Sequence, residues 1–283
     1  MHLIVRFDVD TWSCAHRGMP FLIDLASSLD AHFSFMVNMG RAVSRTMTLR
    51  QGLRRRLKGS SPMPTPSAKL GSVERMGWPA YLYTAVVNPR VGSGAHSILL
   101  RALGAGHSLG LHGGTNHGEW QWGAQSWSRQ RLHAEVAWGL AEFAKAGLPR
   151  PLGFSSPGWN SPQLLPEVLL EHGFTQLHDR HVPGELNPPG RADGDGLVEL
   201  NTAFAGEPGG IGFFENALVR DLSAAQLAQA IATRLQAEAD SIGMVYDHPV
   251  FCAGKGRQLF SQTMVCLRER GVRLIASCEE AGK

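Results

Sequence analysis

The feature that most constrains the fold of this 283-residue chain is a regular alternation of short apolar runs with helical patterns. Eight runs have the length and composition of strands: Leu3–Phe7, His32–Val37, Ser108–Leu111, Leu152–Phe154, Phe174–Leu177, Leu197–Leu200, Ile242–Tyr246 and Arg273–Ile275. Six stretches between them have helical periodicity: Pro20–Leu29, Ser97–Leu103, Ser126–Ala146, Pro162–Glu171, Ser223–Ala239 and Arg257–Arg270. This alternation predicts βα units and a mainly parallel sheet or barrel.

Helix boundaries are also marked in the sequence. Ser223 precedes an alanine-rich run and is a good N-terminal cap. Gly173 and Gly271 stand where two helical patterns end, and glycine is the preferred residue at that point. No interdomain linker is evident, so we expect a single domain spanning residues 1–283.

Several polar residues directly follow apolar runs, where the functional residues of parallel βα folds gather. Asp8 and Asp10 follow the first run, and His112 and His248 follow later ones. Because residues i and i+2 of a strand share a face, Asp8 and Asp10 can point to the same place. One carboxylate and two imidazoles with open positions make a hydrolytic divalent-metal site, and the second carboxylate is free to act as a base.

The length, targeting and cysteine signals indicate a cytoplasmic protein. There is no 18-residue apolar run and no secretory signal at the N-terminus. The four cysteines include no Cys-x-x-Cys pair, so reduced thiols are expected.

Three motifs carry a resemblance to a known family: Phe7–Asp10, Gly106–His112 and Tyr246–Pro249. Shorter landmarks fall between them in the same order: Asn38–Arg41, Gly77–Pro79, Gly158-Trp159, Asp179-Arg180 and Val219–Asp221. Together they resemble the successive motifs of the polysaccharide deacetylase family, the NodB-homology family also called carbohydrate esterase family 4. Within it, the chain is most similar to the formamido-arabinose phosphoundecaprenol deformylase branch of lipid A modification.

The resemblance implies a distorted (β/α) barrel of about seven strands and one divalent metal ion, usually zinc. It implies hydrolysis of an acyl group on a sugar. Asp10 and His112 resemble metal ligands, and Asp8 resembles the base that takes a proton from the attacking water. His248 resembles the acid that protonates the leaving amine. Trp159, Asp179, Arg180 and Arg41 fall in matched motifs and are expected to contact the substrate, although Asp179 could instead orient the acid histidine. Backbone N–H groups near Gly158-Trp159 match an oxyanion contact.

The chain departs from the family pattern at three places. Four residues separate His112 from His117, where the family usually has three, so that either His117 or Asn116 completes the metal site. The loop containing Gly113 and Gly114 can accommodate the extra residue, and imidazole is the better zinc ligand, which favours His117. The arginine of the family's third motif has no counterpart in Ser155–Trp159, and Pro249 and Phe251 replace more polar residues.

A tryptophan cluster, Trp120, Trp122 and Trp127, fits either a sugar-stacking platform or ordinary core packing.

Charge distribution gives a hint of the substrate. No acidic residue lies between Asp30 and Glu74, whereas eight basic residues do. Leucines repeat every four residues at Leu49, Leu53 and Leu57, which predicts a basic amphipathic helix over residues 43–58. Such a helix suits the interface of an anionic membrane, and arginine suits phosphate. We regard residues 41–80 as a basic insertion and expect no nucleic-acid partner, because no recognition motif accompanies the charge.

Three hypotheses follow from the sequence. The first is a deformylase or deacetylase of an amino sugar linked to polyprenyl phosphate, a glycolipid substrate met at the cytoplasmic face of the inner membrane. The second is a soluble sugar or polysaccharide N-deacetylase with the same metal chemistry. The third is a non-enzymatic binding protein with a degenerate metal site.

Overall fold

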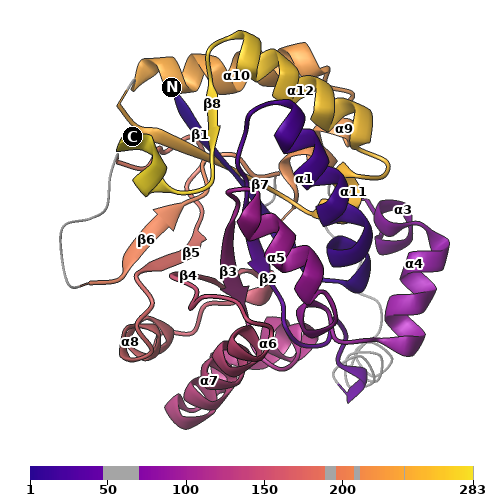
Figure 1. Ribbon diagram of the computed structural model, residues 1–283, viewed down its shortest axis with the longest axis vertical. Helices are drawn as coiled ribbons and strands as arrows, with labels where there is room; N and C mark the ends of the chain where they lie inside the picture. Colours follow the sequence, from indigo (N-terminus) through magenta and orange to yellow (C-terminus); the bar gives the residue numbers. More distant parts are fainter. Residues whose placement is uncertain (47–69, 189–195, 207–210, 239, 283) are drawn as a thin grey trace, which may run out of the picture.

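The computed structural model describes residues 1–46, 70–188, 196–206, 211–238 and 240–282. Eight strands alternate with helices along the chain (Figure 1): β1 His2–Val9, β2 Ser34–Val37, β3 Ser108–His112, β4 Gly153–Ser155, β5 Gln176–Arg180, β6 Val198–Asn201, β7 Ile242–Asp247 and β8 Arg273–Ile275. The α-helices are α1 Met19–Ser28, α3 Ser72–Met76, α4 Trp78–Leu82, α5 His96–Gly104, α6 His117–Gly123, α7 Arg129–Lys145, α8 Leu165–Glu171, α9 Phe213–Val219, α10 Ala224–Ala237, α11 Pro249–Cys252 and α12 Arg257–Glu269. All eight predicted strands and all six predicted helices are confirmed.

The strands form one parallel sheet that curls into a nearly closed barrel. Seven strands follow the order β6-β5-β4-β3-β2-β1-β7, and β8 pairs with the first residues of β1. The two ends of this order meet through isolated bridges, Phe204 with Val245 and Asn187 with Ile242. Helices surround the sheet, with α10 and α12 side by side on one flank (Figure 1). The predicted (β/α) barrel of about seven strands is therefore confirmed.

Successive side chains of β1 point alternately out of the barrel and into its interior. Phe7 points outward, where its ring lies 5.6 Å from those of Phe35 and of Phe260 on α12. Arg6, one residue earlier, points inward and donates to the carbonyl oxygen of His178 on β5, which is not a neighbour of β1. Asp8 therefore also faces the interior.

Glycines on two central strands give the interior room for larger side chains. A Cβ at Gly110 would lie 2.3 Å from Sδ of Met36, and a Cβ at Gly153 would lie 3.0 Å from Nε2 of His178. The barrel is therefore a packed core through its middle, and open space is left at its ends.

The predicted helix signals act as expected. Ser223 accepts a hydrogen bond from the backbone N–H of Gln226 at 3.3 Å, and Gly173 and Gly271 have φ values of +70° and +76°. The sequence patterns did not reveal the short helices α3, α4, α6, α9 and α11, which have seven residues or fewer.

The basic segment falls largely outside the described residues. The predicted amphipathic helix over 43–58 is described only as far as residue 46, so it stays a prediction. Within the described ranges, no helix is both long and apolar enough to cross a bilayer.

Candidate metal centre and active site

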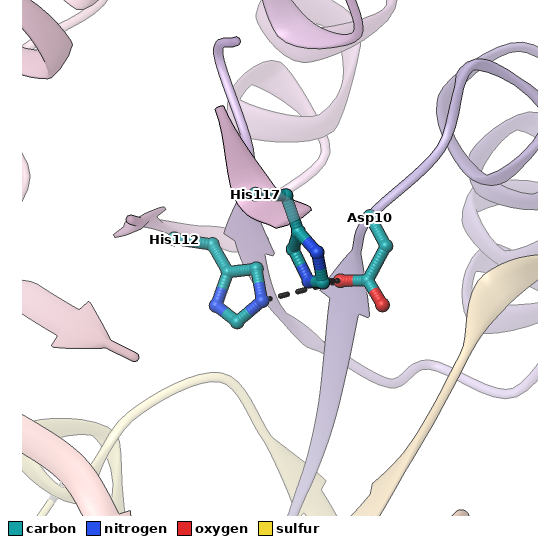
Figure 2. Close-up of side chains that lie close together, drawn as sticks. All are labelled: Asp10, His112 and His117. Atoms are coloured by element: carbon teal, nitrogen blue, oxygen red, sulfur yellow. Dashed lines mark ion pairs between the residues drawn. The ribbon is translucent and has the colours of Figure 1, made fainter. Parts of the chain in front are cut away.

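Asp10, His112 and His117 come from three elements and meet at the carboxyl end of the barrel (Figure 2). Asp10 follows β1, His112 ends β3, and His117 begins α6. Oδ1 of Asp10 lies 3.2 Å from Nε2 of His112 and 3.3 Å from Nε2 of His117. One ligand atom from each residue falls within 4.8 Å of the others, and no second cluster of this kind occurs among the described residues.

The loop between β3 and α6 brings His117 to this point in place of Asn116. Gly113 has a φ of +73°, which glycine adopts without strain. Asn116 is the N-terminal cap of α6: its Oδ1 accepts from the backbone N–H of Glu119 at 3.0 Å, and its Nδ2 donates to the carbonyl of Val43. The extra residue of the loop is thus accommodated before α6 begins, and the first residue of the helix, His117, points its imidazole toward Asp10.

The carboxylate of Asp10 has the surroundings of a metal ligand. Its Oδ1 is buried and has no hydrogen-bond partner, although two imidazoles lie near it. Burial alone would raise the pKa of Asp10, but the imidazoles of His117, His112 and His248 hold this pKa well below its usual value. For His112, the carboxylates of Asp8 and Asp10 outweigh burial and raise the pKa. The residues fit a divalent cation, because one carboxylate and two imidazole ligands surround one point while Oδ1 of Asp10 has no hydrogen-bond partner.

Ser155 at the end of β4 orients the imidazole of His112. Nδ1 of His112 lies 3.1 Å from the carbonyl oxygen of Ser155 and 2.6 Å from its hydroxyl. Since a carbonyl can only accept, Nδ1 carries the proton, and the lone pair of the neutral ring lies on Nε2. This arrangement is typical of a metal-binding histidine, whose second nitrogen is fixed by a hydrogen bond.

Asp8 is held by a buried arginine two residues before it. Nε and a terminal nitrogen of Arg6 each lie 2.9 Å from an oxygen of Asp8, which gives a bidentate pair. Oδ2 of Asp8 also lies 3.9 Å from Nε2 of His112. The guanidinium of Arg6 packs 4.9 Å from the ring of Trp159 and 5.4 Å from that of Tyr246. The carboxylate is therefore fixed beside the three candidate ligands.

His248 stands on the other side of Asp10. Its Nε2 lies 3.2 Å from Oδ2 of Asp10 and 3.1 Å from the hydroxyl of Tyr246. The neighbouring Asp247 has a structural role, because it accepts from the backbone N–H groups of Phe214 and His248 at 2.8 and 2.6 Å. Burial raises the pKa of Asp247 to about 6. These bonds fix the end of β7, and with it the position of His248.

A cavity of about 660 Å³ opens above these residues. Its wall includes all five predicted catalytic and metal-binding residues, Asp8, Asp10, His112, His117 and His248, and also Trp159. Trp159 has a φ of +59°, a conformation that is strained for a non-glycine residue and costs on the order of 1–3 kcal/mol. Its packing against Arg6 and Tyr246 offsets this cost.

The other predicted substrate contacts do not line this cavity. Arg41 donates to the carbonyl of Asn88. Arg180 pairs with Glu185 at 2.6 Å. Asp179 accepts from the backbone N–H of Ser156 at 2.7 Å and so supports the turn that carries Trp159, and burial raises its pKa.

Two cationic residues that the sequence did not assign to the site line the cavity instead. They are Arg75 and Arg45, and the sequence marked Arg45 only as one of the basic residues of the predicted 43–58 helix. The backbone N–H of Trp159 is already bonded to the carbonyl of Ser156 at 3.0 Å, so it is not a free oxyanion donor. Of the tryptophan cluster, Trp120 is fully buried in the core, Trp127 packs against it edge-on, and Trp122 is exposed away from the cavity wall.

No protein-family model matches the chain. Among curated proteins, the probable 4-deoxy-4-formamido-L-arabinose-phosphoundecaprenol deformylase ArnD of Shewanella sediminis (strain HAW-EB3) is 28% identical over 182 residues. The match covers 62% of this chain and 55% of that protein, so the chain spans about half the length of this curated relative.

Solved structures show the same fold. The polysaccharide deacetylase Bc1974 of Bacillus cereus superposes with a TM-score of 0.52 over 99% of this chain and 93% of that one, at 13% identity. Puue allantoinase superposes with a TM-score of 0.58 over 99% and 88%, at 10% identity. The chain therefore has the polysaccharide deacetylase fold. The resemblance to polysaccharide deacetylases that the sequence motifs indicated is confirmed, and the curated protein similar to this chain is a probable formamido-arabinose deformylase.

Proposed function

We propose that this protein is a metal-dependent amidohydrolase that removes an N-formyl or N-acetyl group from an amino sugar carried on a polyprenyl phosphate. The observation that carries the proposal is the convergence of Asp10, His112 and His117 on one point of the cavity, with Asp8 and His248 beside them. A carboxylate and two imidazoles suit zinc, and hydrolysis needs no redox chemistry.

Each residue has a task that its position supports. A divalent ion held by Asp10, His112 and His117 would polarise the acyl oxygen and acidify the attacking water. Asp8 accepts the proton of that water, and the bidentate contact with Arg6 fixes the plane of its carboxylate. His248 delivers a proton to the leaving nitrogen, without which an amine departs poorly.

The position of Tyr246 helps His248 in this role. Its hydroxyl lies 3.1 Å from Nε2 of His248, and burial raises the pKa of Tyr246 well above its usual value. Tyr246 therefore stays uncharged and keeps a hydrogen-bonding group beside the imidazole at neutral pH. The arrangement orients the ring without adding a charge.

The cavity wall favours a phosphate-bearing carrier over a free sugar. Arg45 supplies positive charge to the wall, and Met76 and Tyr81 supply apolar surface. Arg75 also lines the wall, where its guanidinium lies 3.6 Å from the buried carboxylate of Glu215. Arginine binds phosphate through paired N–H donors. The curated relative acts, by its name, on a formamido sugar linked to phosphoundecaprenol. We therefore propose a similar carrier here.

Product release from two substrates tests the proposal. The zinc-loaded protein is incubated with 4-deoxy-4-formamido-L-arabinose-phosphoundecaprenol and, separately, with N-acetylglucosamine oligomers, while free formate and acetate are measured. We expect formate from the first substrate and little acetate from the second, and Asp8→Asn serves as the inactive control. Acetate from the oligomers alone would instead identify a sugar N-deacetylase, and no product from either would indicate a binding protein.

A further inference from the structure

A stripe of exposed apolar side chains runs along one side of α4 and the π-helical segment η2 (Tyr83–Val87) that continues it. Five of the fourteen exposed large apolar residues in the described part of the chain fall in these ten positions. They are Trp78, Leu82, Tyr83, Val86 and Val87, exposed by 57, 42, 37, 65 and 50%. We call these five residues the apolar stripe. Exposed apolar surface gathered in this way marks an interaction site more often than scattered single residues do.

The opposite side of the same segment belongs to the cavity wall. Ala80 and Thr84 are buried, and Tyr81, Thr84 and Ala85 line the cavity. The apolar stripe and part of the cavity wall are thus two sides of one short helical segment. Whatever covers the stripe stands beside the cavity wall.

The stretch of sequence that contains the apolar stripe is strongly basic. Between Asp30 and Glu119 the only acidic residue is Glu74, and eleven basic residues lie in the same interval. One of them, Arg45, is exposed and donates to the carbonyl of Val86 at 2.7 Å, which places a cation at the end of the stripe. Apolar residues led by tryptophan and flanked by arginine are the composition of helices that lie in a membrane interface.

We propose that the apolar stripe docks the protein on the surface of an anionic lipid bilayer, with the stripe in the headgroup region and the cavity wall beside it. The charge favours this partner over a second copy of the chain, because two copies joined through the stripe would bring their Arg45 side chains near one another. A stable dimer also needs roughly 1,000 Å² of buried surface, far more than five side chains on one short segment offer.

Vesicle sedimentation with two matched pairs of substitutions tests the proposal. The first pair, Leu82→Ser with Val86→Ser, removes apolar surface from the stripe. The control pair, Leu170→Ser with Val265→Ser, does the same on α8 and α12, and Leu170 has the same 42% exposure as Leu82. None of the four residues lines the cavity. Binding is measured on phosphatidylglycerol–phosphatidylcholine vesicles and on phosphatidylcholine alone, without substrate, and therefore independently of the proposed hydrolysis.

We expect the wild-type protein to bind the anionic vesicles and to leave the neutral ones largely free. The stripe pair should weaken binding about tenfold or more, and the control pair less than about twofold. No binding of the wild-type protein, or equal losses for both pairs, would overturn the proposal. Light scattering without vesicles adds a further check, because a wild-type dimer that the stripe pair converts to a monomer would show that the stripe joins two copies instead.

Discussion

The two ends of the barrel both contain a cavity with polar residues in its wall, yet their chemistry differs. At the amino end, a space of about 190 Å³ has both apolar and polar residues in its wall, and two of the polar ones bond to protein groups: Nε2 of Gln176 donates to Glu279 at 2.9 Å, and the hydroxyl of Ser108 donates to the carbonyl of Ala276 at 2.9 Å. At the carboxyl end, Oδ1 of Asp10 is buried without a hydrogen-bond donor beside two imidazoles. Polar lining alone therefore does not define a site, whereas an unsatisfied carboxylate oxygen with two imidazole nitrogens within 3.3 Å does.

His178, which lies between the two ends, shows that an unsatisfied polar group alone does not define a site either. Both of its ring nitrogens are buried without partners, and it lines the amino-end cavity. Burial and the nearby Arg6 lower the pKa of His178 well below its usual value, so the ring is neutral. A single neutral imidazole without a second converging ligand offers no metal site.

Among substitutions at the two ends, His112→Ala should have the largest effect on metal binding and activity. Removing one of three ligands should abolish both bound zinc and hydrolysis while the fold, measured by circular dichroism, is largely kept. Metal content by plasma mass spectrometry is the direct measurement. Stoichiometric zinc in this variant would show that the ligand set is wrong.

At the same end, substitution of Asp8 should distinguish the proposed catalytic base from the metal ligands. Asp8→Asn keeps a side chain of the same shape but cannot accept the proton of water. We expect bound zinc to be retained and kcat to fall by about 100- to 10,000-fold. Loss of the metal together with activity would place Asp8 among the ligands instead.

His248→Ala should give a loss that depends on the substrate. A proton donor matters most when the leaving group is a poor one, so amide hydrolysis should fall by about 100-fold or more, and hydrolysis of an activated aryl ester much less. The two rates are measured on the same zinc-loaded preparation. Equal losses would argue against a role as the general acid.

A substitution at the amino end, Gln176→Ala, should have the smallest effect on activity. Gln176→Ala removes one neutral-to-charged hydrogen bond with Glu279, so the free energy of unfolding should fall by about 1–3 kcal/mol. The value of kcat/KM should not change. Urea unfolding and a steady-state assay measure the two quantities, and a tenfold loss of kcat/KM without unfolding would contradict the separation of the two ends.

The strand pattern and the position of the cavity could be predicted because period-two apolar runs and the carboxyl ends of parallel strands obey general rules. The spacing that linked Asp8 to Asp10 would also have found Arg6, and the same spacing links Tyr246 to His248. Arg180 shows where this rule fails. A one-residue register shift in β5 between Leu177 and Arg180 interrupts the alternation, and Arg180 pairs with Glu185 away from the cavity.

Arg45 and Arg75 could not be found from spacing. Arg75 belongs to the short helix α3, and Arg45 lies in the segment after β2, well beyond the end of that strand, so neither stands directly at the end of an apolar run. The seven-residue helix α6 was also too short to produce a periodic pattern. Its start nevertheless decides which residue faces the metal position, since Asn116 is used as the cap and His117 follows it.

Anomalous X-ray diffraction from zinc-loaded crystals, at energies above and below the zinc absorption edge, tests the central claim most directly. We expect one strong zinc peak within about 2.0–2.2 Å of Oδ1 of Asp10 and of Nε2 of His112 and His117, with a further position open to water. A peak bonded to Asn116 in place of His117, or the absence of a peak between these residues while zinc binds elsewhere, would contradict the account.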